Sequence, residues 1–340
     1  MARRESEMKK TRLCEVLGIE YPVIQAPMDW ITDAGLAATV SNAGGLGVIG
    51  PNAGERTVTD SVVETGERLR REIRKAKSLT EKPFGVNLIV MELPIGFPEG
   101  GKAFSDQCLK VTLEEGVPVA VLVGNAPEAY AKQLKKAGIK VLHRALPAVN
   151  VAAARKAEEA GVDAFVAVGF EGGGHTGANC IPTSVLVPQI VDALRIPVVA
   201  GGGIADGRGM VAALSWGAEG VYMGTRFIAT TECPAHEKVK QAIVEAGDIS
   251  TLTLRGILGM VRSLKTPLTT RCAAMEAAGR PLKEITDLYH SGYIKGMLEG
   301  NTIEGTFICG AACGLIREVK GAATVVRDTI REAEQVLAKL

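Results

Sequence analysis

The feature that most constrains this chain is a repeated alternation of short apolar segments with helical segments. The apolar segments lie at residues 22–28, 46–50, 84–90, 117–123, 140–145, 164–168, 196–200 and 220–224. Helical spacing of apolar residues follows most of them, at 33–43, 57–77, 126–137, 151–160, 186–194 and 208–215. Such alternation is typical of a parallel sheet. An open doubly wound sheet is one arrangement, but eight units favour a closed (β/α)8 TIM barrel, with its active site at the C-terminal ends of the strands.

The alternation of apolar strands and helical segments ends after residue 228. Helical patterns at 235–246, 268–278 and 282–292 follow one another without a clear strand. We therefore expect a barrel formed by residues 12–228 plus 305–340 and a small helical cap domain at 229–304 on the substrate side. A last helix, 322–340, is expected to pack back on the barrel, and residues 1–12 to form a loose tail.

The segment 163–177, DAFVAVGFEGGGHTG, combines a short apolar strand with a glycine-rich loop. Glycines let a backbone turn sharply and approach a ligand closely. His175 is the one group in this segment that exchanges a proton near neutral pH. The pattern indicates an active-site rim with a catalytic histidine, and the alternative is a tight turn with a surface histidine. Glu171 is expected either to support this site or to be solvated.

Two further glycine turns follow the last two apolar strands, at AGGGIADG (200–207) and MGT (223–225). In a TIM barrel, the loops after strands seven and eight commonly hold a phosphate on backbone N–H groups. The spacing favours a phosphate site over ordinary strand-to-helix turns. A dinucleotide-binding fold is disfavoured, because no GxGxxG opens the first unit.

Three positions near other strand ends are candidates for contact with a flat ring or an anion. Ala26-Pro27-Met28 ends the first strand, and Asn87 lies in the third. An apolar strand end with one amide suits a conjugated ring, although most methionines are core residues. Arg144, near the end of the fifth strand, is expected either to pair with an anion or to be an ordinary rim residue.

Charge and cysteine content limit the partners. The chain has 39 Lys+Arg and 38 Asp+Glu, a net charge of +1, which gives no electrostatic reason to expect nucleic acid or an anionic membrane. No apolar run reaches the ~20 residues that span a bilayer, and we see no signal peptide. Seven scattered cysteines fit a reducing cytoplasm, and we expect Cys309 and Cys313 to be buried rather than to bind metal. The partners expected are a small-molecule substrate and, from the apolar cap helices, a second copy of the chain in a homodimer.

The motifs IQAPM, GGLGVIG, FGVN, GFEGGGHTG, VVAGGGIADG and GTRF occur in this order. In this combination the chain resembles the nitronate monooxygenase (2-nitropropane dioxygenase) family, which includes the FabK-type flavin-dependent enoyl-ACP reductases. The resemblance covers about residues 12–335. It implies an FMN-binding (β/α)8 barrel with a small helical domain over the flavin.

The resemblance also implies roles for individual residues. His175 matches the catalytic histidine of the family. The FMN phosphate cradle and the positions beside the flavin ring and ribityl chain match Ala26, Pro27, Met28, Asn87, Gly173, Gly174, Gly202, Gly203, Tyr222, Met223, Gly224 and Thr225. No metal site is implied. NAD(P)H is a further cofactor if the chain follows the reductase branch.

Two residues differ from the family pattern at positions that affect which reaction is expected. Val168 stands where many nitronate monooxygenases have Gln and FabK-type enzymes have Glu, and Ala311 stands where both usually have Gln. Asp29-Trp30 and the run GTRFIATTECPAH favour the reductase branch, whereas Ala26-Pro27 favours the monooxygenase branch.

Three functions follow from these residues. The first is FMN-dependent oxidation of alkyl nitronates or nitroalkanes with O2, with His175 as general base. The second is NAD(P)H-dependent, FMN-dependent reduction of an enoyl thioester or a quinone. The third is a phosphate- or flavin-binding barrel without a redox role, which the glycine turns alone permit.

Overall fold

The structure, a computed structural model, describes residues 10–91, 101–125 and 127–340, so most of the expected N-terminal tail lies outside it. Its main sheet has eight parallel strands in the order β1-β9-β8-β6-β5-β4-β3-β2. A parallel bridge between Ile24 and Leu46 joins the two ends of this order into a nearly closed barrel. The strands are β1 (Val23–Gln25), β2 (Val48–Ile49), β3 (Gly85–Val90), β4 (Val119–Gly124), β5 (Lys140–Ala145), β6 (Ala164–Val168), β8 (Val198–Gly201) and β9 (Gly220–Met223). The TIM barrel and its eight predicted strands are confirmed.

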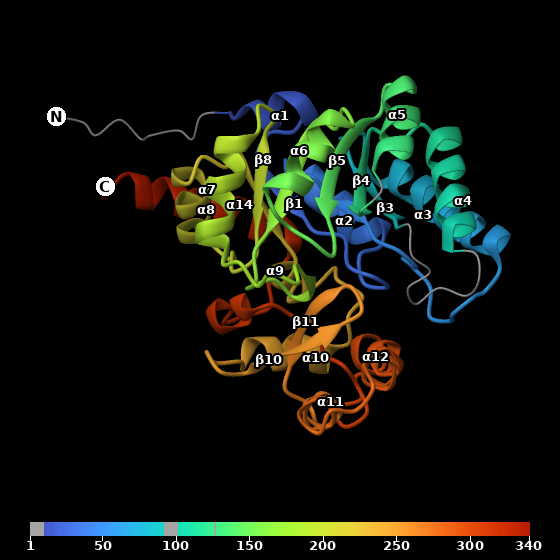
Figure 1. Ribbon diagram of the computed structural model, residues 1–340. Helices are drawn as coiled ribbons and strands as arrows, with labels where there is room; N and C mark the ends of the chain where they lie inside the picture. The colour runs from blue at the N-terminus through green and yellow to red at the C-terminus, as the bar shows by residue number, and fades with distance from the viewer. Residues whose placement is uncertain (1–9, 92–100, 126) are drawn as a thin grey trace.

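Helices surround the barrel (Figure 1). They are α1 (Arg12–Leu17), α2 (Ala34–Asn42), α3 (Val62–Leu79), α4 (Gly101–Glu115), α5 (Glu128–Lys136), α6 (Val151–Glu159), α7 (Thr183–Ala193), α8 (Gly207–Ser215), α9 (Thr225–Ile228) and, from the C-terminus, α14 (Ala322–Leu337). Sequence analysis missed α4. Its buried positions include Phe104, Leu109 and the polar Thr112, so no continuous apolar stripe marks the helix.

The strands are apolar because both of their faces are buried, as expected for a parallel sheet. In β4, Val119 and Val121 belong to the cluster inside the barrel, whereas Ala120 and Leu122 pack in the layer between sheet and helices. A strand buried on both sides has no polar face. Its short length and the glycines that bound it are therefore what identify it in the sequence.

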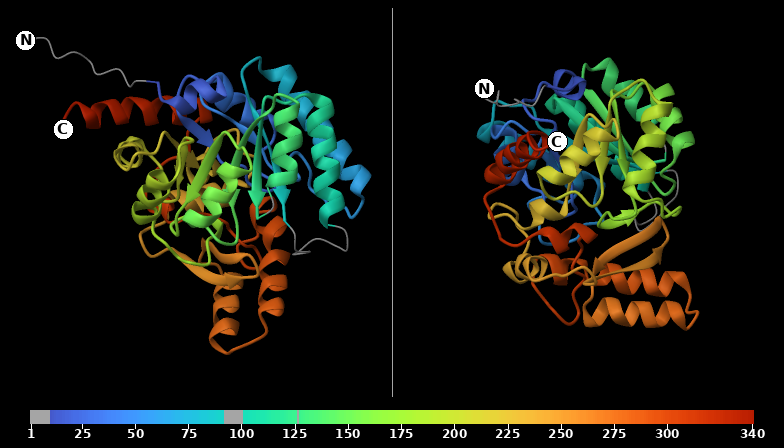
Figure 2. Two further views of the ribbon diagram at one scale, coloured as in Figure 1. Left: turned by 45° about the horizontal axis from the view of Figure 1, so that its top comes forward. Right: turned by 90° about the vertical axis from the view of Figure 1, so that its left-hand side faces the viewer.

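The cap covers the end of the barrel toward which the strands run (Figure 1). It contains α10 (Glu237–Val244), α11 (Pro267–Ala277), α12 (Leu282–Ser291) and α13 (Tyr293–Met297), with α11 and α12 side by side (Figure 2). The expectation of an all-helical cap is wrong. Residues 251–264 form an antiparallel hairpin, β10 (Thr251–Gly256) and β11 (Gly259–Leu264).

The hairpin joins the cap to the barrel through one more strand. β7 (Gly174–Thr176), part of the glycine-rich loop after β6, pairs antiparallel with β11, and His175 lies opposite Val261. The cap has its own small core, which includes Leu254, Val261 and Ile285. The sequence TLTLRG alternates apolar and polar residues, which is a short strand pattern among longer helical ones.

The chain returns from the cap to the barrel through a 3-10 helix, η1 (Ala311–Leu315), and then α14. Helix α14 packs on α8 and α2, as expected for the last helix. Gly207 makes this contact close, because a Cβ there would come within 2.2 Å of Ala333 N. None of the helices in the described ranges has the length and apolar character needed to cross a membrane.

Candidate active site

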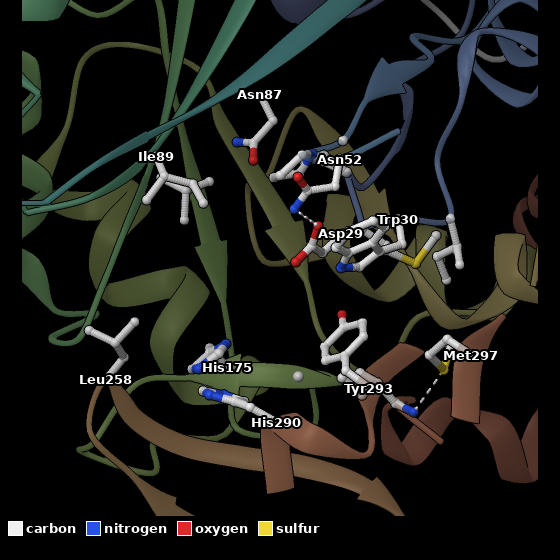
Figure 3. Close-up of a pocket in the computed structure, with 18 of the residues that line it drawn as sticks. Asp29, Trp30, Asn52, Asn87, Ile89, His175, Leu258, His290, Tyr293 and Met297 are labelled. Atoms are coloured by element: carbon white, nitrogen blue, oxygen red, sulfur yellow. Dashed lines mark hydrogen bonds between the residues drawn. The ribbon is translucent and has the colours of Figure 1, made fainter. Parts of the chain in front are cut away.

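A cavity of approximately 530 Å³ lies between the strand ends of the barrel and the cap. From the barrel it is lined by Pro27 and Met28 after β1, by Asn87 in β3, and by the segment Gly173-Gly174-His175. Figure 3 shows the side chains around it, including His290, Tyr293 and Met297 from the cap. A cavity at the strand ends that also meets a second domain is the usual place for a ligand.

His175 lies on one wall of this cavity, close to His290 of α12 (Figure 3). The two imidazole rings are tilted, with centroids 5.9 Å apart. The backbone of His175 is fixed twice, because it pairs with β11 and its carbonyl oxygen accepts a hydrogen bond from the Arg144 guanidinium. The alternative of a surface histidine in a simple turn does not fit this position.

Burial keeps both histidines neutral. Desolvation, with smaller contributions from His290 and Arg144, lowers the pKa of His175 to about 3. Desolvation also lowers the pKa of His290. At neutral pH each imidazole has one ring nitrogen able to accept a proton or a hydrogen bond and one able to donate.

Arg144 places a positive charge deep beside His175. Partial burial of its side chain lowers the pKa of the guanidinium. No carboxylate in the described ranges pairs with it, and its Nε has no hydrogen-bond partner there. The Tyr222 hydroxyl is likewise buried without a partner. Buried polar atoms are normally paired, so these two fit a bound ligand that has acceptor atoms.

Two other sequence candidates form the wall near β1 and β3. Ala26 continues the β1–β9 pairing, donating its N–H to Met223 O at 2.9 Å. A Cβ on Gly224 would lie 3.5 Å from Met28 Sδ, so the ends of these strands touch. Asn87 donates its Nδ2 hydrogen to Val121 O at 2.8 Å, which fixes its orientation at the cavity.

The remaining sequence candidates lie beside the cavity rather than in its lining. Gly202 and Gly203 follow β8 with φ of 94° and 77°, a backbone conformation that favours glycine. Thr225 Oγ1 accepts a hydrogen bond from Gly310 N at 2.8 Å, which ties the end of β9 to the segment before η1. The structure thus brings Pro27, Met28, Asn87, Gly173, Gly174 and His175 into one cavity and leaves Ala26, Gly202, Gly203, Tyr222, Met223, Gly224 and Thr225 at the adjoining strand ends.

The structure also places Glu171 and the two departures from the family pattern, Val168 and Ala311. Glu171 Oε2 accepts hydrogen bonds from Thr183 N at 2.9 Å and Thr183 Oγ1 at 2.7 Å, so it caps α7 rather than facing solvent. Val168 is buried in the barrel interior, and Ala311 donates its N–H to Glu171 O at 2.9 Å.

Sequence reasoning did not select four residues that line the cavity, namely Asp29, Asn52, Tyr293 and His290. Asp29 follows Met28 directly, so its position beside a candidate strand end was an available signal. The two cap residues had none, because only the docking of α12 and α13 over the barrel brings them to the strand ends.

Comparison with known proteins agrees with this geometry. The family model for nitronate monooxygenase matches residues 10–332. A dehydrogenase from Mycobacterium tuberculosis, named for a hydroxy-methyl-oxo-octahydroindene-carboxyl-CoA substrate, is 31% identical over 95% of this chain and 96% of its own length. A probable nitronate monooxygenase from Staphylococcus saprophyticus is 37% identical over 73% of this chain and 76% of its own.

Among solved structures, FabK from Thermotoga maritima superposes with a TM-score of 0.86 and 35% identity, covering 98% of both chains. The family model and these relatives are oxidoreductases, and the family is flavin-dependent. The match spans the barrel, the cap and the returning C-terminal segment, with His175 and the glycine turns inside it. The chain therefore belongs to the nitronate monooxygenase family of flavin-dependent oxidoreductases.

Proposed function

We propose that this chain is an FMN-dependent oxidoreductase that oxidises alkyl nitronates and nitroalkanes with O2. The observation that supports this most is the pair formed by His175 and Arg144. A neutral imidazole on the cavity wall lies next to a cation that no carboxylate in the described part of the chain pairs with. Such a pair suits a substrate that is an anion or becomes one.

The residues fit FMN in three places. The positive-φ glycines 202 and 203, with the end of β9 at Met223–Thr225, would hold the phosphate. Met28 and Asn87 would lie beside the ring system, and Arg144 Nε and the Tyr222 hydroxyl have unused hydrogens for its polar atoms. Bound there, FMN would supply the two-electron chemistry that side chains lack.

The side chains would handle the proton and the charge. A nitroalkane transfers its α-carbon proton to the unprotonated ring nitrogen of His175, leaving the electron pair of the C–H bond on the substrate as a nitronate. Arg144 lowers the energy of that anion through its positive charge. A nitronate supplied ready-made needs no base, so His175 then acts only in binding.

A second function, the reduction of an enoyl thioester with NAD(P)H as reductant, is favoured by a different observation. FabK covers nearly the whole chain at 35% identity, and the Mycobacterium relative is named for a CoA thioester. The cap side of the cavity is also lined by Ile257, Leu258 and Ile285, which suits an acyl chain. Quinone reduction belongs to the same alternative.

Stopped-flow absorbance of the FMN-loaded protein under argon separates these functions. One sample is mixed with ethylnitronate and another with NADH or NADPH. Fast bleaching by the nitronate supports the monooxygenase, whereas fast bleaching by a nicotinamide alone supports the reductase. Flavin that binds but is bleached by neither supports a barrel without a redox role, and failure to bind flavin contradicts the cofactor assignment.

A further inference from the structure

Asp29 is held at the cavity by an unusual local backbone. Its carboxylate Oδ1 accepts a hydrogen bond from Asn52 Nδ2 at 2.9 Å, and Trp30 N donates to Pro51 O at 2.9 Å. Trp30 and Asn52 both have positive φ, 67° and 52°, in a region that non-glycine residues avoid. Strain of this kind persists where the surroundings fix it, and it gathers at ligand sites. Here it aligns the loops after β1 and β2 so that Asp29 faces the cavity.

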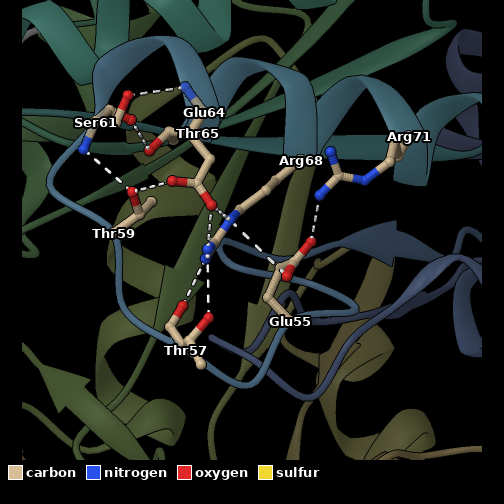
Figure 4. A network of polar contacts seen from close by, with 8 residues as sticks. All are labelled: Glu55, Thr57, Thr59, Ser61, Glu64, Thr65, Arg68 and Arg71. Atoms are coloured by element: carbon tan, nitrogen blue, oxygen red, sulfur yellow. Dashed lines mark hydrogen bonds and ion pairs between the residues drawn. The ribbon is translucent and has the colours of Figure 1, made fainter.

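No cation pairs with Asp29 among the described residues. The nearby Arg68 of α3 is bound to Glu64 and to Thr57, in the network that Figure 4 shows. Arg144 binds the backbone carbonyl of His175 and forms no ion pair with Asp29. The carboxylate accepts hydrogen bonds from the Asn52 side chain and the Trp30 backbone, and desolvation outweighs both.

Of the other titratable groups around the cavity, Arg255 of β10 forms an ion pair with Glu276 at 3.8 Å. His175 and His290 are neutral, because burial lowers the pKa of each. Glu72 of α3, which also lines the cavity, accepts a hydrogen bond from Ala34 N at 2.8 Å. Desolvation therefore dominates, and it raises the pKa of Asp29 to about 7. A large part of the Asp29 population is a carboxylic acid at neutral pH.

Tyr293 of α13 brings a second donor to the same wall. Its hydroxyl points up toward Asp29 from the cap side, and both side chains line the cavity (Figure 3). Burial, followed by the charge of Asp29 and by Tyr289, raises the pKa of Tyr293 well above its usual range. The phenol keeps its hydrogen at every pH at which the protein is used.

We propose that the Asp29 carboxylic acid and the Tyr293 hydroxyl form a two-donor site that binds the oxygen of the substrate's nitro or carbonyl group, across the cavity from His175. The inference rests on the proposed function, and it names the substrate class as compounds whose reacting carbon is conjugated to an oxygen. Negative charge develops on that oxygen when the α-carbon loses a proton or when hydride adds to a conjugated C=C. Two aligned donors in a desolvated site stabilise such charge.

The oxygen has two sources with the same chemistry, a planar nitro or nitronate group and a thioester carbonyl. Inorganic nitrate is a probe for the first, and S-butyryl-N-acetylcysteamine for the second. Neither probe is turned over, so calorimetric titration of the FMN-loaded protein measures binding without turnover. Titrations are made on both sides of pH 7, where the carboxylic acid is present or absent.

The variants are Tyr293→Phe and Asp29→Asn, with Tyr21→Phe and Asp60→Asn as matched controls outside the cavity lining. In the wild type, affinity for one probe should fall as pH rises through 7, because Asp29 loses its donor hydrogen. Tyr293→Phe should weaken that probe about tenfold, the usual effect of one hydrogen bond to a charged or polarised oxygen. In Asp29→Asn the pH dependence should vanish, and the controls should match the wild type.

The probe that responds identifies the source of the oxygen. Wild-type binding of neither probe, unchanged affinity in Tyr293→Phe, or an unchanged pH dependence in folded, FMN-loaded Asp29→Asn would each overturn the inference. Infrared spectra give a second readout, because the carboxylic-acid C=O band present below pH 7 should be absent from Asp29→Asn. If the probes respond as expected but ethylnitronate does not bleach the flavin, the proposed monooxygenase fails while the two-donor site stands.

Discussion

The two walls of the cavity use the same physical effect with opposite signs. On the barrel loop, burial lowers the pKa of His175 to about 3, whereas on the wall after β1 it raises the pKa of Asp29 to about 7. Desolvation disfavours the charged form of any group, so a base loses its proton and an acid keeps it. The comparison teaches that, below pH 7, this cavity holds a neutral acceptor on one wall and a neutral donor on the other.

The positive charge beside His175 comes from Arg144, which cannot lose its proton at ordinary pH. An unpaired buried cation is costly unless a ligand or backbone carbonyl partly offsets it. Among the described residues, the His175 carbonyl oxygen accepts a hydrogen bond from it. Four tests examine the opposite pKa shifts of His175 and Asp29 and the charge of Arg144.

The largest effect should come from His175→Ala, which removes the acceptor from one wall. General-base contributions are typically about 10²–10⁴-fold in rate, so turnover of neutral nitroalkanes should fall by that amount. Flavin content should be retained, because the His175 side chain lines the cavity and the glycines that would hold the phosphate after β8 are unchanged. Steady-state rates with nitroethane and with ethylnitronate measure the effect, and full activity on nitroethane would remove His175 from its role.

Next in size is Arg144→Met, which keeps the volume of the side chain and deletes the charge. Hydrogen bonds to charged groups contribute about 1.5–3 kcal/mol, so affinity for FMN or an anionic substrate should drop by about tenfold to a hundredfold. Fluorescence titration of the apoprotein with FMN measures it. Arg144→Lys serves as the control that keeps the charge, and equal affinity in Arg144→Met would show that the guanidinium faces no ligand.

Asp29→Asn should change how stability depends on pH. The folded pKa of about 7 exceeds the ordinary 3.8, so the native state holds an extra proton between these values. The stability that this group contributes is fully present below the lower value and is lost as pH rises through 7. The variant should therefore gain on the wild type across this range by about 2 kcal/mol, allowing for partial access to the cavity.

Urea unfolding at a series of pH values from the ordinary pKa of 3.8 to above the folded value of about 7 measures that gain. In Asp60→Asn, which changes an exposed carboxylate, the free energy of unfolding should depend on pH as it does in the wild type. Parallel curves for Asp29→Asn as well would mean that Asp29 is ionised normally and that the two walls do not differ as described.

The smallest effect concerns the hydrogen bond between Thr225, at the end of β9, and Gly310, before η1. Thr225→Val removes the acceptor for Gly310 N, and a buried donor left unpaired costs about 1–3 kcal/mol. We expect a loss near the lower end, about 1 kcal/mol, measured by urea unfolding with Thr231→Val at an exposed position as control. No difference between the two variants would show that this contact does not hold the strand ends together.

The sequence predicted the barrel well because its signals are local. Each of the eight strands is a short apolar run bounded by turn residues, and glycine turns mark the ends of β6, β8 and β9. The prediction failed where signals were weak or masked, as in α4, whose buried face includes Thr112, and in the hairpin 251–264.

The candidate site also has one part that the sequence predicted and one part that only the fold shows. The sequence alone determined that the chain forms a parallel barrel and that His175 lies in a glycine-rich loop at its rim, because strand length, glycine position and residue type are properties of short segments. Only the tertiary structure decided that this loop becomes β7 of the cap sheet and that Tyr293 faces Asp29 from 264 residues away in the chain. The neutral states of His175 and Asp29 come from burial by both domains, and burial is a property of the assembled fold.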